Sequence, residues 1–236
     1  MIRVYAAHVW DAEQAIGQES LLGVLETRER ERIARFPNPE DRMRSAVAHL
    51  LIRKVVAASP NVDRDRIQFA RDVYGKPFVW NAPGFDFNLA HAGDWAVCAT
   101  DSRPLGVDVE VVRPLDVEVA AGVLSAHERR DLLRRQPLER LRRFYELWTL
   151  KESYLKALGL GLRIPPDSFT VQIRPPAEIM LTGANASQGY HFQQYDVDRD
   201  HPAAVCATND AFPQRIVYVE SRELRELARR LAVAPR

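Results

Sequence analysis

The feature that most constrains the fold of this chain is a pentapeptide, AVCAT, that occurs twice, at residues 96–100 and 204–208. Each copy is small and apolar and is followed closely by Asp or Asn, which is typical of a buried strand that ends in a turn. Each copy also follows a long helical pattern and further short strand patterns. We interpret the chain as α+β, a pseudo-twofold duplication of a unit in which one long helix packs on a small antiparallel sheet. The alternative is two unrelated halves that share a pentapeptide by chance.

The joint between the two predicted units lies near TDSRPLG, where Pro104 and Gly106 interrupt the pattern. We therefore divide the chain into an N-terminal unit, residues 1–103, and a C-terminal unit, residues 104–236. At this length the chain is large enough to bury a substantial core.

The composition excludes several classes of protein. A net charge of +1 argues against a protein that coats nucleic acid or an anionic membrane. No apolar run approaches the ~20 residues of a membrane span, and the N-terminus lacks a signal-peptide pattern. Two cysteines, Cys98 and Cys206, cannot form a disulfide framework, and no Cys/His cluster has the spacing of a zinc site. We expect a cytoplasmic monomer with neither nucleic-acid nor membrane partners.

A carboxylate interrupts the apolar face of the predicted helix that contains FYELWTLKESYLKALGLGL. At 100° per residue, one stripe contains the following apolar side chains: Leu141, Phe144, Tyr145, Trp148 and Leu155. Glu152 falls inside this stripe, with Lys151 and Lys156 at its edges. A buried carboxylate needs an ion pair, hydrogen bonds or a metal. A simple Glu152–Lys156 pair on the surface, or a position at the rim of the stripe, is the plainer explanation.

A second pair of acids lies on the strand pattern LGVDVEVV, just after the joint. Strict alternation puts Asp108 and Glu110 on one face, about 7 Å apart along the strand. An ordinary half-exposed strand with its acids in water is the alternative. Together with Glu152, these acids would form three hard oxygen ligands, which suit Mg²⁺ or Mn²⁺ and do not suit zinc. Neither a Walker A loop nor a dinucleotide-binding glycine motif is present to bind phosphate.

Several segments together resemble one family. GVDVE followed by LWTLKESYLKALGLGL is similar to the paired signature of the Sfp-type 4′-phosphopantetheinyl transferases. RERERIARFPNPEDRMRS resembles the basic N-terminal helix of that family, YGKPF its adenine-side turn, and FNLAHAGDWAVCA its Asn-x-Ser-His-Ser segment. The chain departs from the last pattern because Ala90 and Ala92 replace the two serines around His91.

The resemblance implies an enzyme that transfers the 4′-phosphopantetheine group of coenzyme A to a serine of an apo acyl or peptidyl carrier protein. The reaction would depend on Mg²⁺, with Mn²⁺ as a possible replacement, and would release adenosine 3′,5′-bisphosphate. The first unit would bind the nucleotide, the second would carry the metal and the catalytic residues, and the active site would lie between them. Two rival functions remain: a metal-dependent phosphohydrolase of pyrophosphates that resemble coenzyme A, and a non-catalytic module that binds coenzyme A.

The resemblance also implies roles for individual residues. Asp108, Glu110 and Glu152 would bind the metal, and Glu152 would accept the serine proton. Lys156 would stabilise charge on the leaving phosphate. The residues implied in binding coenzyme A are Arg32, Arg44, Lys76, His91, Lys151 and Lys156, of which Lys151 is expected to steer the substrate or to pair locally. Purely structural explanations also exist. Arg32 could lie on a solvated, mixed-charge helix face, His91 could be a buried structural histidine, and turn chemistry could explain the segment around Lys76.

The arginine-rich segment AHERRDLLRRQPLERLRRFYELW lies between the two signature motifs. Acidic residues within the segment neutralise part of the arginine charge, and such a mixed-charge segment is typical of a solvated helix face. The alternative is a basic surface that steers an acidic carrier protein toward the site.

Overall fold

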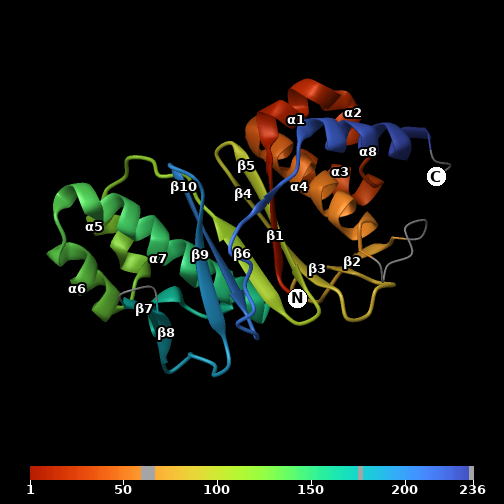
Figure 1. Cartoon of the computed structure of the whole chain (residues 1–236). Coiled ribbons are helices and arrows are strands. Elements are labelled where there is room, and N and C mark those ends of the chain that lie inside the picture. Colours follow the sequence, from red (N-terminus) through yellow and green to blue (C-terminus); the bar gives the residue numbers. More distant parts are fainter. Residues whose placement is uncertain (60–66, 175–177, 234–236) are drawn as a thin grey trace.

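The computed structural model describes residues 1–59, 67–174 and 178–233, which form two α+β halves side by side (Figure 1). The first half contains β1 (Arg3–His8), α1 (Val9–Ile16), α2 (Gln18–Gly23), α3 (Thr27–Ala34), α4 (Pro39–Ala57), β2 (Phe69–Arg71), β3 (Pro77–Val79), β4 (Asp86–Ala92) and β5 (Trp95–Asp101). The second half contains β6 (Leu105–Val109), α5 (Val117–Ala120), α6 (Ala126–Arg134), α7 (Pro137–Leu158), β7 (Phe169–Arg174), β8 (Glu178–Gly183), β9 (His191–Asp198) and β10 (His201–Ala207). Short 3₁₀ turns lie at Ala121–Val123, Gly161–Arg163 and Pro166–Ser168.

The order of strands is the same in the two main sheets. The first half has the order β1-β5-β4 and the second has β6-β10-β9, with all of these neighbours antiparallel. The two AVCAT segments lie in the central strands β5 and β10, and one long helix, α4 or α7, packs on each sheet. The predicted α+β class is therefore confirmed, whereas a common origin of the halves stays an interpretation.

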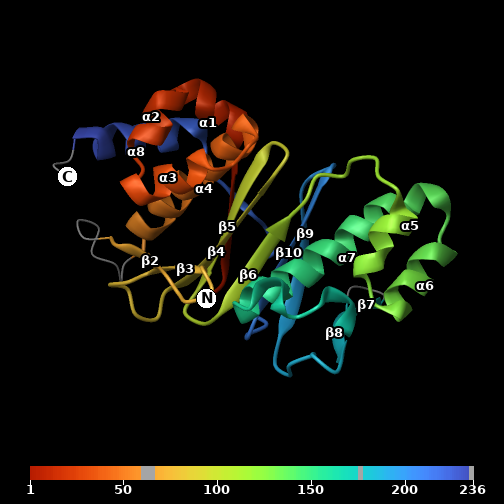
Figure 2. The same cartoon turned by 180° about the vertical axis from the view of Figure 1, so that it is seen from behind.

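The end of the chain returns to the first half. β11 (Val217–Tyr218) pairs in parallel with β1, and α8 (Ser221–Val233) lies beside α1 and α4 in both views (Figures 1 and 2). Leu224 and Leu227 of α8 are buried in the same apolar cluster as Val47 of α4. The predicted division between residues 103 and 104 stays a prediction. Strand β11 and helix α8, which follow that boundary in the sequence, pack with the first half. Among the described residues, no helix has the length and apolar character needed to cross a membrane.

Helix α4 is the central element of the first half. Its N-terminus is capped by Asn38, whose side-chain oxygen accepts from the backbone N–H of Glu40, and proline occupies its first turn. Because the sheet, α1 and α8 surround it, the helix is buried on most sides, and its buried residues include Arg44, His49 and Arg53. Buried polar groups need internal partners, so these three side chains are held in defined positions.

The two halves meet where the edge strands β4 and β6 lie next to each other. The Asp86 carboxylate accepts from the backbone N–H of Leu105 at 3.0 Å, and the Asn88 amide oxygen accepts from that of Val107 at 2.9 Å. Two backbone N–H groups of β6 therefore donate to side chains of β4, and not to the backbone of a neighbouring strand. An apolar cluster contributed by both halves fills the space beside this contact.

Strand β6 and helix α7 approach each other closely in the second half. A Cβ atom at Gly106 would lie 2.1 Å from the backbone oxygen of Ser153 and 2.4 Å from the backbone nitrogen of Ala157. Only glycine permits this approach, because both neighbouring atoms belong to the backbone of the helix. As a result, the residues that follow Gly106 in β6 lie directly against α7.

We predict that Gly106→Ala lowers the free energy of unfolding by at least about 2 kcal/mol, because overpacking forces backbone elements apart. Urea unfolding would measure the loss. Gly122→Ala is the matched control, since a Cβ at Gly122 meets nothing within 4 Å. Equal unfolding midpoints for wild type and Gly106→Ala would contradict the packing described above.

Candidate active site

Asp108 and Lys156 form an ion pair at the junction of the two halves. The Lys156 ammonium group lies 2.6 Å from one carboxylate oxygen of Asp108 and 3.2 Å from the carbonyl oxygen of Val107. Asp108 is only 5% exposed, and its second carboxylate oxygen, Oδ2, is buried with no hydrogen-bond partner. Burial raises the pKa of Asp108, although the charge of Lys156 opposes this shift. The lone oxygen is an acceptor without a donor.

Two further carboxylates share this electrostatic environment. Burial and the nearby charge of Asp108 raise the pKa of Glu110 to about 7, against the opposing effects of Lys156 and Trp148. Burial and Asp108 likewise raise the pKa of Glu152. The three acids lie close enough for their charges to repel, which disfavours the fully ionised group in the free protein.

A divalent cation fits these residues in charge and in donor type. Within the described ranges, no three His, Cys, Asp or Glu side chains already lie close enough together to form a metal site. The unpartnered Oδ2 of Asp108 nevertheless offers a hard oxygen ligand, and a cation would remove the repulsion that acts on Glu110 and Glu152. In the free protein, the Lys156 ammonium provides the neighbouring positive charge.

His91 and Arg44 belong to the first half and face the same junction. Burial and the positive charge of Lys156 lower the pKa of His91 to about 4, so its imidazole is neutral at pH 7. Arg44 donates through Nε to the Gly93 carbonyl oxygen at 2.7 Å and forms ion pairs with Glu40 and Asp41. His91 therefore lies near Lys156, and Arg44 lies near His91 and is held by Gly93, Glu40 and Asp41.

Lys76 joins the turn between β2 and β3 to the junction. Its ammonium group lies 3.1 Å from the Asp86 carboxylate and donates to the Leu105 carbonyl oxygen at 3.0 Å. Lys76 therefore contacts the start of β6 through two partners. Its contact with coenzyme A stays a prediction.

Lys151 forms a local ion pair, which is one of the two roles expected for it, and its contact with coenzyme A stays a prediction. The Lys151 side chain is fully buried and pairs with Glu128 at 2.8 Å, and its ammonium also donates to the Pro166 and Phe169 carbonyl oxygens. It lies 4.2 Å from the centre of the Phe169 ring. This lysine therefore connects α7 to α6 and β7.

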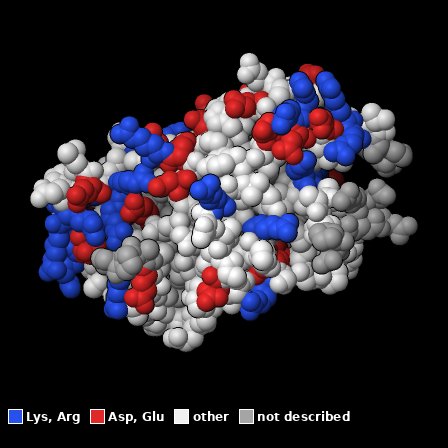
Figure 3. Space-filling model, viewed as in Figure 1, with Lys and Arg blue, Asp and Glu red and all other residues white. Residues whose placement is uncertain are grey.

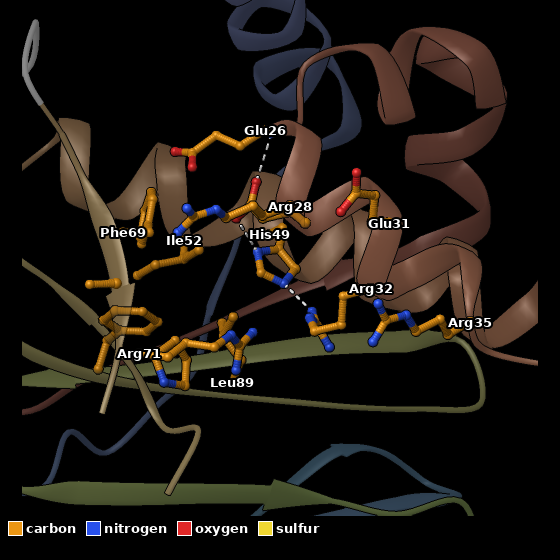
Figure 4. A pocket seen from close by; sticks show the side chains of 14 residues that line it. Glu26, Arg28, Glu31, Arg32, Arg35, His49, Ile52, Phe69, Arg71 and Leu89 are labelled. Atoms are coloured by element: carbon orange, nitrogen blue, oxygen red, sulfur yellow. Dashed lines mark hydrogen bonds and ion pairs between the residues drawn. The ribbon is translucent and has the colours of Figure 1, made fainter. Parts of the chain in front are cut away.

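Arg32 lines a cavity of about 530 Å³ between α3, α4 and the β2–β3 hairpin (Figure 4). The cavity combines basic, apolar and acidic side chains, the acids being Glu26, Glu29 and Glu31. Its lining includes Arg28, Arg32, Arg35, Arg71, His49, Ile52, Phe69, Phe87 and Leu89. The Nη2 atom of Arg32 lies 2.6 Å from Nε2 of His49. The three junction carboxylates are not among the residues that line this cavity.

Some residues of the site carried no clear signal in the sequence. Trp148 belonged to the predicted apolar stripe, yet it also helps to lower the pKa of Glu110 against the effect of burial. His49 lies within an apolar helical pattern and its partner Glu29 within a mixed-charge helix, so only the fold brings them together. Ala90 and Ala92, which replace the serines of the family pattern, belong to the apolar cluster between the halves.

Three carboxylates and Lys156 thus share the junction of the two halves, and four arginines line the cavity of the first half. Residues 10–103 match the family model described as 4′-phosphopantetheinyl transferase, N-terminal. Residues 104–206 match that of the 4′-phosphopantetheinyl transferase superfamily.

Individual relatives agree with the family models. The 4′-phosphopantetheinyl transferase Sfp of Bacillus subtilis (strain 168) is 34% identical, over 87% of this chain and 92% of the relative. A second 4′-phosphopantetheinyl transferase of Bacillus subtilis is 32% identical, over 94% of this chain and 100% of the relative. HetI of Nostoc sp. (strain PCC 7120 / SAG 25.82 / UTEX 2576) is 32% identical, over 66% of this chain and 69% of the relative. The chain belongs to the Sfp-type 4′-phosphopantetheinyl transferases.

We predict that Lys151→Met lowers the free energy of unfolding by about 3–5 kcal/mol, because it leaves the buried Glu128 carboxylate without its counter-ion. Chemical denaturation would measure this loss. In the folded fraction the KM for coenzyme A should equal that of the wild type. A stable variant with a raised KM would instead support the predicted contact between Lys151 and coenzyme A.

Proposed function

We propose that this enzyme transfers the phosphopantetheine group of coenzyme A to a serine hydroxyl of an apo carrier protein, with Mg²⁺ as the required cation. The observation that carries the proposal is the coupled group of Asp108, Glu110 and Glu152 beside Lys156, with one buried carboxylate oxygen still unpartnered. Membership of the transferase family supports the reaction class.

The reaction exchanges one phosphorus–oxygen bond for another. The serine oxygen attacks the β-phosphorus of coenzyme A, which bears the pantetheine arm, and the bond from this phosphorus to the bridging oxygen breaks. Adenosine 3′,5′-bisphosphate leaves, and the serine proton passes to a base. Positioning and charge stabilisation provide most of the catalysis in reactions of this kind.

Residues of the junction have separate tasks in this reaction. Glu152 accepts the proton of the attacking serine, directly or through an ordered water. Lys156 stabilises the charge that develops on the leaving phosphate. Asp108, Glu110 and Glu152 would hold the cation, which when bound neutralises pyrophosphate charge. Mn²⁺ prefers similar oxygen ligands and is a reasonable substitute.

The first half would bind the nucleotide. Arg44, His91, Lys76 and Arg32 would contact it; His91 lies near Lys156, Lys76 pairs with Asp86 beside β6, and Arg32 lines the cavity below α3. A neutral His91 can donate to a phosphate, or can take up a proton when the phosphate arrives, because the anion favours the charged imidazole.

A basic surface on α6 suits an acidic carrier protein. Arg129, Arg130 and Arg134 are exposed on this helix, and Figure 3 shows basic side chains gathered over that end of the molecule with acids among them. Arg135 differs, because it is partly buried and pairs with Asp131. Such a surface acts mainly on the rate of encounter between the two proteins.

Intact mass measurement of an apo carrier protein tests the proposal. Incubation with this enzyme, coenzyme A and Mg²⁺ should add the mass of one phosphopantetheine group to the carrier. Release of phosphopantetheine with no modified carrier would instead indicate a phosphohydrolase. Binding of coenzyme A with no product at all would indicate a binding module.

We predict that Asp108→Asn weakens Mn²⁺ binding and that Glu152→Gln lowers kcat by about a hundredfold or more, as expected for the loss of a general base. Electron paramagnetic resonance of Mn²⁺ would measure binding separately from turnover. Glu139→Gln is the matched control, since Glu139 is an exposed carboxylate at the other end of α7. Unchanged Mn²⁺ affinity in Asp108→Asn would remove this residue from the set of ligands.

We also predict that Arg130→Glu with Arg134→Glu lowers kcat/KM for the carrier, most strongly at low ionic strength, because salt screens such charges within about 10 Å. The KM for coenzyme A should not change. Arg225→Glu with Arg229→Glu is the matched control, because these arginines have the same spacing on α8 and are also exposed. If both pairs of reversals had equal effects, α6 would have no special role in carrier binding.

A further inference from the structure

The cavity below α3 contains a chain of three side chains, Glu29, His49 and Arg32, all of which line it. The Arg32 guanidinium donates to Nε2 of His49 at 2.6 Å, and Nδ1 of His49 lies 2.8 Å from Oε1 of Glu29. The second carboxylate oxygen of Glu29 accepts from Arg53. Figure 4 shows His49 next to Arg32, with the interaction between them drawn.

The direction of donation in this chain is determined by Arg32. An arginine can only donate, so Nε2 of His49 must be the acceptor and the imidazole must be neutral with its proton on Nδ1. Nδ1 lies 2.8 Å from Oε1 of Glu29, at ion-pair distance but without the alignment of a hydrogen bond, so Glu29 holds the ring through its charge and close contact. Burial lowers the pKa of His49, in agreement with a neutral ring. Burial alone would raise the pKa of Glu29, but the close contact with His49 and the charge of Arg53 outweigh it and lower this pKa to about 2.

Arg32 keeps donors for a ligand after these contacts are made. Its Nε is buried with no partner, and the guanidinium has five N–H donors in a fixed plane. Arg32 and Arg71 both line the cavity, where their like charges repel, and burial and the charge of Arg71 lower the pKa of Arg32. A dianion between them would convert this repulsion into attraction, and arginine suits phosphate in particular.

The chemistry of the cavity fits a nucleotide that carries a phosphomonoester. Phe69, Phe87 and Leu89 form an apolar part of the wall and four arginines form the basic part, while Glu26, Glu29 and Glu31 also line the cavity. The junction carboxylates and Lys156 lie outside this lining, so a phosphate bound here is distinct from the pyrophosphate at the junction.

We propose that Glu29 and His49 are positioning residues that orient Arg32 toward the 3′-phosphate of coenzyme A and thereby set the preference for the 3′-phosphorylated nucleotide. This inference rests on the proposed function, because it assumes that coenzyme A is the substrate and that Arg32 faces its 3′-phosphate. Neither residue contacts the reacting atoms.

The test compares coenzyme A with 3′-dephospho-coenzyme A, which lacks only the phosphate in question. His49→Leu removes the acceptor for Arg32 and the contact with Glu29, and should raise the KM for coenzyme A by roughly five- to tenfold. The KM for 3′-dephospho-coenzyme A and both kcat values should stay at wild-type levels. His49→Gln keeps one donor and one acceptor and should recover most of the affinity for coenzyme A.

Comparison of Arg32→Ala with His49→Leu distinguishes a failure of the positioning role from a failure of the proposed function. Arg32→Ala should raise the KM for coenzyme A at least as much as His49→Leu, and an unchanged KM would overturn both this inference and the assumed role of Arg32. A raised KM in Arg32→Ala with an unchanged KM in His49→Leu would overturn the positioning role alone, while transfer to the carrier still stands. Equal rises for both nucleotides in His49→Leu would show a purely structural residue.

Glu29→Gln provides a second route if His49→Leu does not fold. Thermal unfolding of this variant with and without each nucleotide needs only folded protein. The wild type should gain more stability from coenzyme A than from 3′-dephospho-coenzyme A, and Glu29→Gln should show a smaller difference. An undiminished difference would contradict the proposal.

Discussion

The contact between β6 and α7 at Gly106 is the constraint on which the rest of the site depends. Because Gly106 has no side chain, the strand lies directly against the helix backbone at Ser153 and Ala157. The residues that follow in the strand and those that surround the contact in the helix are then forced together, which pairs Asp108 with Lys156. The same strand is held on its other side by side chains of β4, so the first half is positioned by the contact as well.

Two lysines of α7 show how the helix divides its faces between structure and function. Lys151 points into the second half, where Glu128 and two carbonyl oxygens satisfy it completely. Lys156, five residues later, lies about 140° around the helix and faces the junction. Its partner Asp108 retains an unpartnered oxygen. A polar network in which every donor and acceptor has a partner favours a fixed structure, whereas a network with an unpartnered acceptor can still bind a ligand.

The sequence could predict the helices and strands but not all of the tertiary contacts between them. The repeated AVCAT segments indicated two central strands, and strand alternation with helical spacing selected Asp108, Glu110 and Glu152 as one group. Sequence spacing could not separate Lys151 from Lys156, because the direction of each depends on which elements cover α7. The pairing of Glu29 with His49 depends on how α3 crosses α4, and the return of α8 to the first half follows from long-range packing. Neither the Glu29–His49 pair nor the packing of α8 produces a local sequence pattern that could predict it.

The central claim is that the junction carboxylates bind the cation next to the pyrophosphate, apart from the cavity for the 3′-phosphate. Phosphorus NMR of coenzyme A bound to the enzyme with substoichiometric Mn²⁺ measures this most directly, because paramagnetic relaxation falls steeply with distance. We expect strong broadening of the two pyrophosphate resonances, weaker broadening of the 3′-phosphate, and loss of this pattern in Asp108→Asn. Equal broadening of all three resonances, or a pattern that survives in Asp108→Asn, would contradict the account.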